Sequence, residues 1–203
     1  MFPEEKKKII KACRLLYDKG LLAGADGNVS LKISGDGPVI VTPSGIHKGF
    51  LKEDDLVIVD LKGSKIDGVR KPTSELPMHL GIYNEDPGAM SVVHTHPPWT
   101  MAMSLAGFSF DPPCLIEAKM LLGRVKILSY RTPGSPELAR VVAKSLSFGP
   151  AQILARHGAV TRGKNLEKAL EFMECLEHTA KTMALSFLLG KVSGSHPSPL
   201  QEE

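Results

Sequence analysis

Two histidines separated by one residue, at the end of an apolar stretch, constrain this chain more than any other feature. Residues 91–93 have the composition of a buried strand, and His94 and His96 follow directly. Residues i and i+2 of a strand point to the same face, so the two imidazoles would aim at one point in space. The prolines at 97–98 then end the strand, because neither can donate a ladder hydrogen bond. The pattern is typical of the start of a metal site, although a His-x-His pair can also arise by chance.

A catalytic metal site needs further ligands, and His157 is the best placed candidate for a third imidazole. It follows the apolar stretch 151–155, and Gly158 after it allows close approach of the backbone. Three neutral imidazoles leave one position of a tetrahedral zinc ion open for water or substrate. Glu75, at an expected helix start, could fill that position at rest. Imidazole also suits Fe, Co, Ni and Cu, so these residues predict a metal site without fixing the metal.

Three short polar segments at the boundaries of expected elements could together bind a phosphate. Such segments present backbone N–H groups and hydroxyls, and one of them lies at a helix N-terminus. Taken singly, each is ordinary turn or cap chemistry. The segments are Gly27 with Asn28, Ser44 with Gly45, and Thr73 with Ser74.

Hydrophobic periodicity and turn residues predict helices and strands in alternation, with no internal repeat and no linker. We therefore expect one α/β domain over residues 1–190, in which helices cover a sheet. Residues 191–203 are rich in Ser and Pro and are expected to form a flexible C-terminal tail. Helices are expected at 6–19, from an N-cap at Thr73 or Ser74 to about 84, at 99–105, at 115–122, from 136 and at 166–189 with Gly190 after it; strands are expected at 29–33, 39–42, 56–61, from 91, at 125–128 and at 151–155.

Charge and composition argue against several classes of protein. The formal net charge is only +3 and the lysines are spread along the chain, so neither nucleic acid nor a membrane is expected as a partner. The longest apolar runs are far shorter than a membrane-spanning helix needs. The first residues lack the apolar core of a signal peptide, and the three cysteines form no C-x-x-C pair. We therefore expect a cytoplasmic protein with reduced thiols.

Taken together and in this order, these motifs resemble the class II aldolases of the fuculose-phosphate aldolase type. The resemblance covers about residues 5–190, and it is specific as a set although no single motif is. The same superfamily includes ribulose-phosphate 4-epimerases, methylthioribulose-phosphate dehydratases and the adducin head domain. The motifs lie at residues 25–30, 42–45, 72–75, 93–97, 157–158 and 165–169.

The resemblance implies a three-layer α/β/α fold with a central, largely antiparallel sheet, assembled as a homotetramer with active sites near subunit interfaces. It implies one Zn²⁺ per subunit, or another divalent transition metal, and Glu75 as a catalytic base or acid beside it. The implied metal ligands are His94, His96 and His157. The implied phosphate-binding residues are Gly27, Asn28, Ser44, Gly45, Thr73 and Ser74.

The implied reaction is that of a zinc-dependent aldolase. It would cleave a phosphorylated ketose such as fuculose 1-phosphate to dihydroxyacetone phosphate and an aldehyde, through a metal-stabilised enediolate. The substrate partner would be a phosphorylated sugar.

Departures from the family pattern keep alternatives open. Fuculose-type aldolases use a tyrosine near positions 115–117 as a proton donor, whereas this chain has Glu117 there, which resembles the methylthioribulose-1-phosphate dehydratases and suggests a second catalytic residue. Glu117 could instead be an exposed, solvated carboxylate, and Tyr130 is another possible donor. The epimerases typically have aspartate where Glu75 stands, and a complete set of metal ligands argues against a non-catalytic, adducin-like scaffold.

Overall fold

The computed structural model describes residues 1–193 of the 203-residue chain. Its strands form one eight-stranded sheet in the order β4-β3-β2-β1-β5-β8-β7-β6. Every neighbouring pair is antiparallel except β6 and β7, which are parallel. The strands are β1 (Asn28–Lys32), β2 (Val39–Val41), β3 (Val57–Val59), β4 (Lys65–Asp67), β5 (Ser91–Thr95), β6 (Lys126–Leu128), β7 (Ala151–Leu154) and β8 (Gly158–Gly163).

Within the same residues, six α-helices and three short 3-10 turns connect these strands. The helices are α1 (Pro3–Asp18), α2 (Leu76–Glu85), α3 (Pro98–Leu105), α4 (Ile116–Leu122), α5 (Pro136–Lys144) and α6 (Leu166–Ser193), and the 3-10 turns are Lys48–Phe50, Glu53–Asp55 and Leu146–Phe148.

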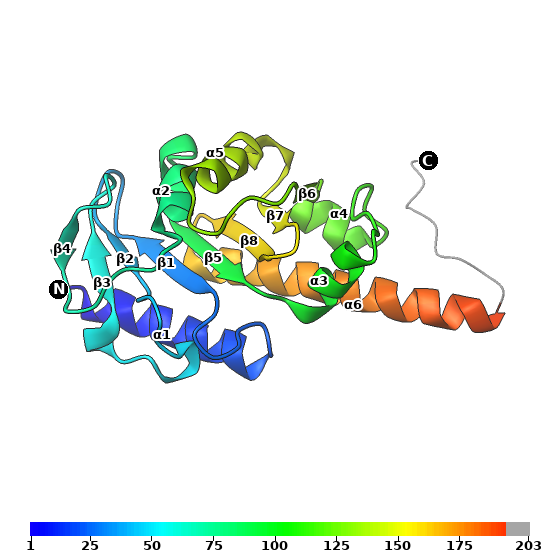
Figure 1. Ribbon diagram of the computed structural model, residues 1–203, viewed down its shortest axis with the longest axis horizontal. Helices are drawn as coiled ribbons and strands as arrows, with labels where there is room; N and C mark the ends of the chain where they lie inside the picture. The colour runs from blue at the N-terminus through cyan, green and yellow to red at the C-terminus, as the bar shows by residue number, and fades with distance from the viewer. Residues whose placement is uncertain (194–203) are drawn as a thin grey trace.

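The helices cover both faces of the sheet and so make three layers. Figure 1 shows α2 and α5 on one side of the sheet, with α1 and α6 on the other. Successive side chains of a strand point to opposite faces. In β2, accordingly, Val39 and Val41 join the core formed with α2 and α5, and Ile40 joins the core formed with α1 and α6. The structure confirms the predicted three-layer α/β/α fold with a largely antiparallel sheet.

Helix α1 packs against β1 on one face of the sheet. Ile9, Cys13 and Leu16 recur at helical spacing and are fully buried, while charged residues cover the outer face. Complete burial of an aliphatic side chain such as Ile9 contributes about 1.5–3 kcal/mol. The three cysteines are free thiols, as expected. No helix in the described part of the chain is both long and apolar enough to cross a membrane.

Helix α2 begins after Glu75, so the predicted N-cap at Thr73 or Ser74 is wrong by one or two residues. The chain before it is still extended, because the Thr73 N–H donates to the Thr42 carbonyl and the preceding proline pairs with Pro43. The Thr73 hydroxyl instead accepts a hydrogen bond from the Glu75 N–H at 3.3 Å. Glu75 therefore lies at the junction between an extended segment and a helix.

Helix α6 continues through Gly190 to Ser193, so its predicted end is also wrong. Glycine in a helix interior costs about 1 kcal/mol relative to alanine but ends the helix only where the backbone turns left-handed. Gly190 has no positive φ. The first three residues of the predicted tail, 191–193, are helical, and residues 194–203 lie outside the described part. Two strands, β4 and β8, were not predicted.

Candidate active site

The central strand β5 positions the first two histidines. His94 lies within the strand, opposite Asn28 of β1 and Val160 of β8. His96 follows one residue after the strand, where its N–H donates to the Leu21 carbonyl at 3.2 Å. The two imidazole centroids are 5.2 Å apart. The rings of this pair therefore converge, as their spacing predicted.

His157 comes to the same point from the turn between β7 and β8. Its ring centroid is 4.8 Å from that of His94 and 5.3 Å from that of His96. One nitrogen from each of the three imidazoles can be chosen so that all lie within 4.8 Å of one another. His96 and His157 are about sixty residues apart in the chain. They lie close together because β5 and β8 are neighbouring strands of the sheet.

The close approach depends on Gly158. A Cβ built at this residue would collide with the Thr95 carbonyl oxygen and would lie 2.8 Å from both His94 Cε1 and His96 Cδ2. Any side chain at Gly158 would therefore push into the rings of the two histidines. The sequence had suggested only that glycine allows close approach, and the structure identifies what it approaches.

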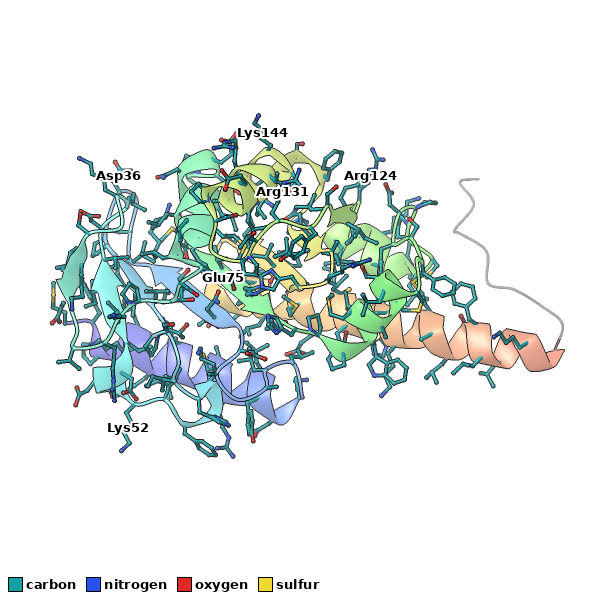
Figure 2. The ribbon with its side chains drawn as sticks, viewed as in Figure 1. Asp36, Lys52, Glu75, Arg124, Arg131 and Lys144 are labelled. Carbon is teal, nitrogen blue, oxygen red and sulfur yellow. The ribbon has the colours of Figure 1, made fainter. Side chains whose placement is uncertain are left out.

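Glu75 completes the cluster from the start of α2. Its Oε2 lies 2.9 Å from His94 Nε2, and its Oε1 lies 3.3 Å from His157 Nε2. The carboxylate is buried and lies near the centre of the molecule (Figure 2). The structure therefore brings together the four residues expected to form a metal site.

The unpaired lone pairs of the three histidines and Glu75 suit a divalent cation. His94 Nδ1 lies 2.9 Å from the Ala159 carbonyl, to which it must donate, so in the neutral ring Nε2 carries a lone pair. His94 Nε2, His96 Nε2 and Glu75 Oε1 are buried and have no hydrogen-bond partner. Acceptor atoms that face one another without a proton or cation between them repel. Three imidazoles beside a carboxylate suit a transition metal such as zinc.

Burial keeps His96 and His157 in the neutral form, which is the form that binds a metal ion. Burial, and then the neighbouring His94, lower the pKa of His157 to about 4. The same two causes lower the pKa of His96 below its ordinary value. Both rings are therefore neutral at pH 7, as a metal ligand must be. Burial alone would raise the pKa of Glu75, but a proton or cation held at His94 and the hydrogen bond from the Asn28 amide lower it below its ordinary value, so the carboxylate is ionised.

A buried chain of hydrogen bonds fixes the orientation of Glu75. The Asn28 amide donates from Nδ2 to Glu75 Oε2 at 3.0 Å, so its Oδ1 faces away and accepts from His79 Nε2 at 2.5 Å. His79 Nδ1 then accepts from the Ser30 hydroxyl at 2.7 Å, and the Tyr83 hydroxyl, 2.7 Å from Ser30, can donate to it. His79 is therefore connected to Glu75 through Asn28.

The three predicted phosphate segments meet at one pocket beside this cluster. Gly27 and Gly45 both line this pocket and adopt left-handed conformations, with φ of 66° and 71°. The pocket is smaller than two open hollows elsewhere, of about 670 and 830 Å³, which contain none of the three clustered histidines. Its volume is about 160 Å³, and its lining includes Gly27, Asn28, Ser44, Gly45, Thr73, Ser74, Glu75, His96 and His157.

Five further residues of this lining were not among the predicted site residues, namely Ala25, Asp26, Pro43, Lys48 and Pro133. Asp26 Oδ2 lies 3.6 Å from His96 Nδ1 and can orient that ring. The turn containing Asp26 was recognised, but nothing in the turn indicated a contact with a histidine seventy residues away. A buried lysine also has no sequence signature that separates it from a surface lysine.

Glu117 and Tyr130 lie apart from the pocket within one chain. Glu117 is exposed on α4 and lines the hollow of about 830 Å³ with Trp99 and Leu121. Tyr130 is 53% exposed. Neither is among the residues that line the pocket, so the catalytic role expected for Glu117 stays a prediction.

Comparison with known proteins gives a consistent result. Residues 7–184 match the Class II Aldolase and Adducin N-terminal domain family. An L-fuculose phosphate aldolase of Methanococcus vannielii is 41% identical over 177 residues, 86% of this chain and 93% of that protein. A 3-oxo-tetronate 4-phosphate decarboxylase of Haemophilus influenzae is 33% identical over 182 residues, 87% of this chain and 85% of that protein. The crystal structure of L-fuculose-1-phosphate aldolase from Thermus thermophilus superposes with a TM-score of 0.79 at 28% identity, covering 94% of this chain and 96% of that one.

Proposed function

Because the chain belongs to the class II aldolase and adducin N-terminal domain family, we propose that it is a metal-dependent lyase acting on a phosphorylated ketose. It cleaves a substrate resembling fuculose 1-phosphate to dihydroxyacetone phosphate and an aldehyde. One observation carries the proposal: a buried carboxylate and three converging imidazoles adjoin a pocket lined by the three segments predicted to bind phosphate. The similarity to L-fuculose phosphate aldolases supports the choice of substrate class.

The three imidazoles would hold one divalent cation, which we propose to be zinc. Bound there, it would act as a Lewis acid that stabilises negative charge developing on the substrate's carbonyl oxygen. The Ala159 carbonyl fixes the His94 tautomer, and Asp26 faces His96 Nδ1, so the protein orients two of these ligands before a cation binds.

Glu75 would move the proton at the reacting carbon. In the cleavage direction a base takes the proton of the hydroxyl group that becomes the aldehyde oxygen, the carbon–carbon bond breaks and the aldehyde leaves. The carbon left with the electron pair then receives a proton to give dihydroxyacetone phosphate. In the reverse direction the Glu75 carboxylate removes that proton. Asn28 holds Glu75 in place through the 3.0 Å hydrogen bond to Oε2.

The phosphate-binding segments would position the substrate from its non-reacting end. Gly27, Asn28, Ser44, Gly45, Thr73 and Ser74 line the pocket and supply backbone N–H groups, hydroxyls and one amide. Binding energy at the phosphate lowers the barrier at the distant carbon by holding it in a reactive position.

A decarboxylation at the same site is the second candidate, favoured by the Haemophilus influenzae relative. Loss of CO₂ from a 3-oxo-tetronate 4-phosphate also leaves dihydroxyacetone phosphate, because its carboxyl group is attached to the carbon that the aldolase would deprotonate. The site therefore faces the same developing charge in both reactions. The dehydratase alternative depends on Glu117, which would have to reach the pocket of another chain in the proposed homotetramer.

A substrate panel tests the proposal. The zinc-loaded protein is given fuculose, rhamnulose and ribulose 1-phosphates and 3-oxo-tetronate 4-phosphate, and the products are identified by mass. We expect dihydroxyacetone phosphate together with an aldehyde from one of the ketose phosphates, and no product after chelation of the metal. Dihydroxyacetone phosphate with CO₂ from the tetronate alone would favour the decarboxylase. Turnover that is unaffected by metal removal would refute both.

Replacing the carboxylate tests the role of Glu75. Glu75→Gln keeps the shape but cannot take the proton, so kcat should fall by roughly 10²–10⁴. Glu85→Gln, on the exposed side of the same helix, is the matched control and should keep wild-type kcat. Equal kcat in the two variants would remove Glu75 from the reaction.

A further inference from the structure

Lys48 is buried in the wall of the pocket and joins two of its loops. Lys48 is only 2% exposed to solvent. Nζ donates to the Ala25 carbonyl at 2.7 Å and to the Ile46 carbonyl at 2.8 Å. Ala25 leads into the segment with Gly27 and Asn28, and Ile46 follows Ser44 and Gly45. A single ammonium group therefore connects two segments that line the pocket.

The backbone of Lys48 strengthens the same connection. Its N–H donates to the Gly24 carbonyl at 2.8 Å, at the start of the 3-10 turn Lys48–Phe50. The side chain thus leaves a backbone position already tied to the first loop. This arrangement directs the ammonium group between the loops rather than toward solvent, although an ammonium ion is costly to bury.

The surroundings compensate this buried charge only in part. Burial lowers the pKa of Lys48, and the nearby Asp26 carboxylate opposes that effect. An ammonium group can donate three hydrogen bonds, and the two carbonyls accept two of them. Lys48 therefore retains the capacity to bind one more acceptor, and a negatively charged one would be favoured.

The pocket otherwise has little positive charge for an anion. Within residues 1–193, Lys48 is the only lysine or arginine among the residues that line it, whereas Asp26 and Glu75 contribute carboxylates. A phosphate monoester carries about −1.5 to −2 charges near pH 7. Neutral N–H groups and hydroxyls can orient such a group. The divalent cation proposed at the three imidazoles would offset the two carboxylates, which leaves Lys48 as the cation that balances the phosphate.

We propose that Lys48 is the cationic residue of the phosphate-binding part of this pocket. Two of its protons hold the loops of Asn28 and Ser44 together, and its charge attracts the substrate phosphate. This inference rests on the proposed function, because it assigns a phosphate to the pocket. It makes Lys48 a positioning and binding residue rather than one that reacts with the carbon chain.

Binding of inorganic phosphate tests the role of Lys48 without any sugar or turnover. Phosphate is titrated by calorimetry into zinc-loaded wild type and Lys48→Met at matched metal content. Removing a charge-assisted hydrogen bond should raise the phosphate Kd roughly tenfold to a hundredfold. Lys52→Met is the charge-matched control, because Lys52 points into solvent at the opposite edge of the molecule from the helices α2 and α5 (Figure 2). Its phosphate Kd should equal that of wild type.

If Lys48→Met does not fold, a second variant and a measurement on the wild-type protein still test the proposal. Lys48→Gln keeps a donor for one carbonyl but no charge, and it should show the same weakening. In wild type labelled with ¹³C at lysine Cε, phosphate should shift the signal of one solvent-protected lysine. An unchanged Kd in the folded variants, or no protected lysine signal that moves, would overturn the proposal. Phosphate bound at the metal alone would give the first of these results.

This test separates the two proposals. Phosphate binding that depends on Lys48, in a protein that cleaves none of the sugar phosphates, would support the anion site and refute the reaction. Cleavage of a ketose phosphate with a phosphate Kd independent of Lys48 would refute the role of Lys48 and leave the reaction standing.

Discussion

At the scale of single residues, the site depends on a histidine that does not belong to the metal cluster. His79 is completely buried, and burial lowers its pKa to about 3. It is therefore neutral at pH 7, with its one proton on Nε2 because Asn28 Oδ1 can only accept. This proton decides which end of the Asn28 amide faces Glu75. A neutral, buried imidazole thus fixes the donor that holds the proposed catalytic carboxylate.

The depressed pKa of His79 predicts a loss of stability in acid. In the unfolded chain His79 has the ordinary histidine pKa of about 6.5. Below that pH the unfolded state therefore binds a proton at His79 that the folded state does not bind. The stabilising contribution is complete above pH 6.5 and declines as the pH falls toward 3. In metal-free protein, urea unfolding between pH 6.5 and 4 should show a pH slope steeper than that of His79→Gln by up to about 1.4 kcal/mol per pH unit.

The control for this experiment is another histidine of the same chain. His178 is exposed on α6, and His178→Gln should keep the wild-type pH slope of the free energy of unfolding. If His79→Gln has the wild-type slope as well, then His79 is not the buried neutral group that the structure indicates.

At the scale of secondary structure, the sequence predicted the parts of the site that lie on regular elements. The His94 and His96 pair followed from strand periodicity, because a period of two leaves little choice of face. The six phosphate-segment residues also lie together as proposed, since each segment carried recognisable turn or cap residues. The helices were predicted in type and order, with errors at the ends.

The errors occur where tertiary contacts override local signals. Pairing of residue 73 with Thr42 delayed the start of α2, which no local pattern at Thr73 could reveal. The β7–β8 turn was missed because Arg156, rather than glycine or asparagine, takes the left-handed conformation there, with φ of 59°. Without that turn, β8 could not be recognised as a separate strand. Lys48 was missed because burial of a lysine depends on segments distant in the chain.

The hairpin of β7 and β8 makes a specific prediction about Gly158. In Gly158→Ala the added methyl group would meet the Thr95 carbonyl and the rings of His94 and His96. Either the hairpin or the rings must move, which should cost about 1–3 kcal/mol of stability and at least tenfold in zinc affinity. Chemical unfolding and competition with a chromogenic chelator measure the two effects.

Another glycine of the chain provides the control. A methyl group added at Gly35 would meet no other part of the protein within 4 Å, and Gly35 has no positive φ, so Gly35→Ala should change stability by no more than about 0.5 kcal/mol. It should leave zinc affinity unchanged. Wild-type zinc affinity in Gly158→Ala would contradict the geometry described for the three histidines.

At the scale of the whole molecule, one helix extends beyond the body of the fold. The C-terminal part of α6 projects past the sheet, at the end of the molecule opposite β4 (Figure 1). Leu185, Leu188 and Leu189 on this part are 43%, 58% and 69% exposed. Neighbouring apolar side chains exposed on a projecting helix are typical of a surface that another protein chain covers. We propose that these leucines contribute to the homotetramer expected from the family resemblance.

Light scattering after size-exclusion chromatography tests this proposal. Wild type should have a mass of four chains of 21.9 kDa each. Leu188→Glu would place a charge in an apolar contact, and burial of an unpaired charge is unfavourable. The variant tetramer should therefore dissociate at protein concentrations at least tenfold higher than those at which the wild-type tetramer dissociates. Val69→Glu is the control, because Val69 is equally apolar and 84% exposed but follows β4 at the far end of the molecule. A monomeric wild type would exclude the tetramer. The same mass for both variants at every concentration would show that the contact between subunits lies elsewhere.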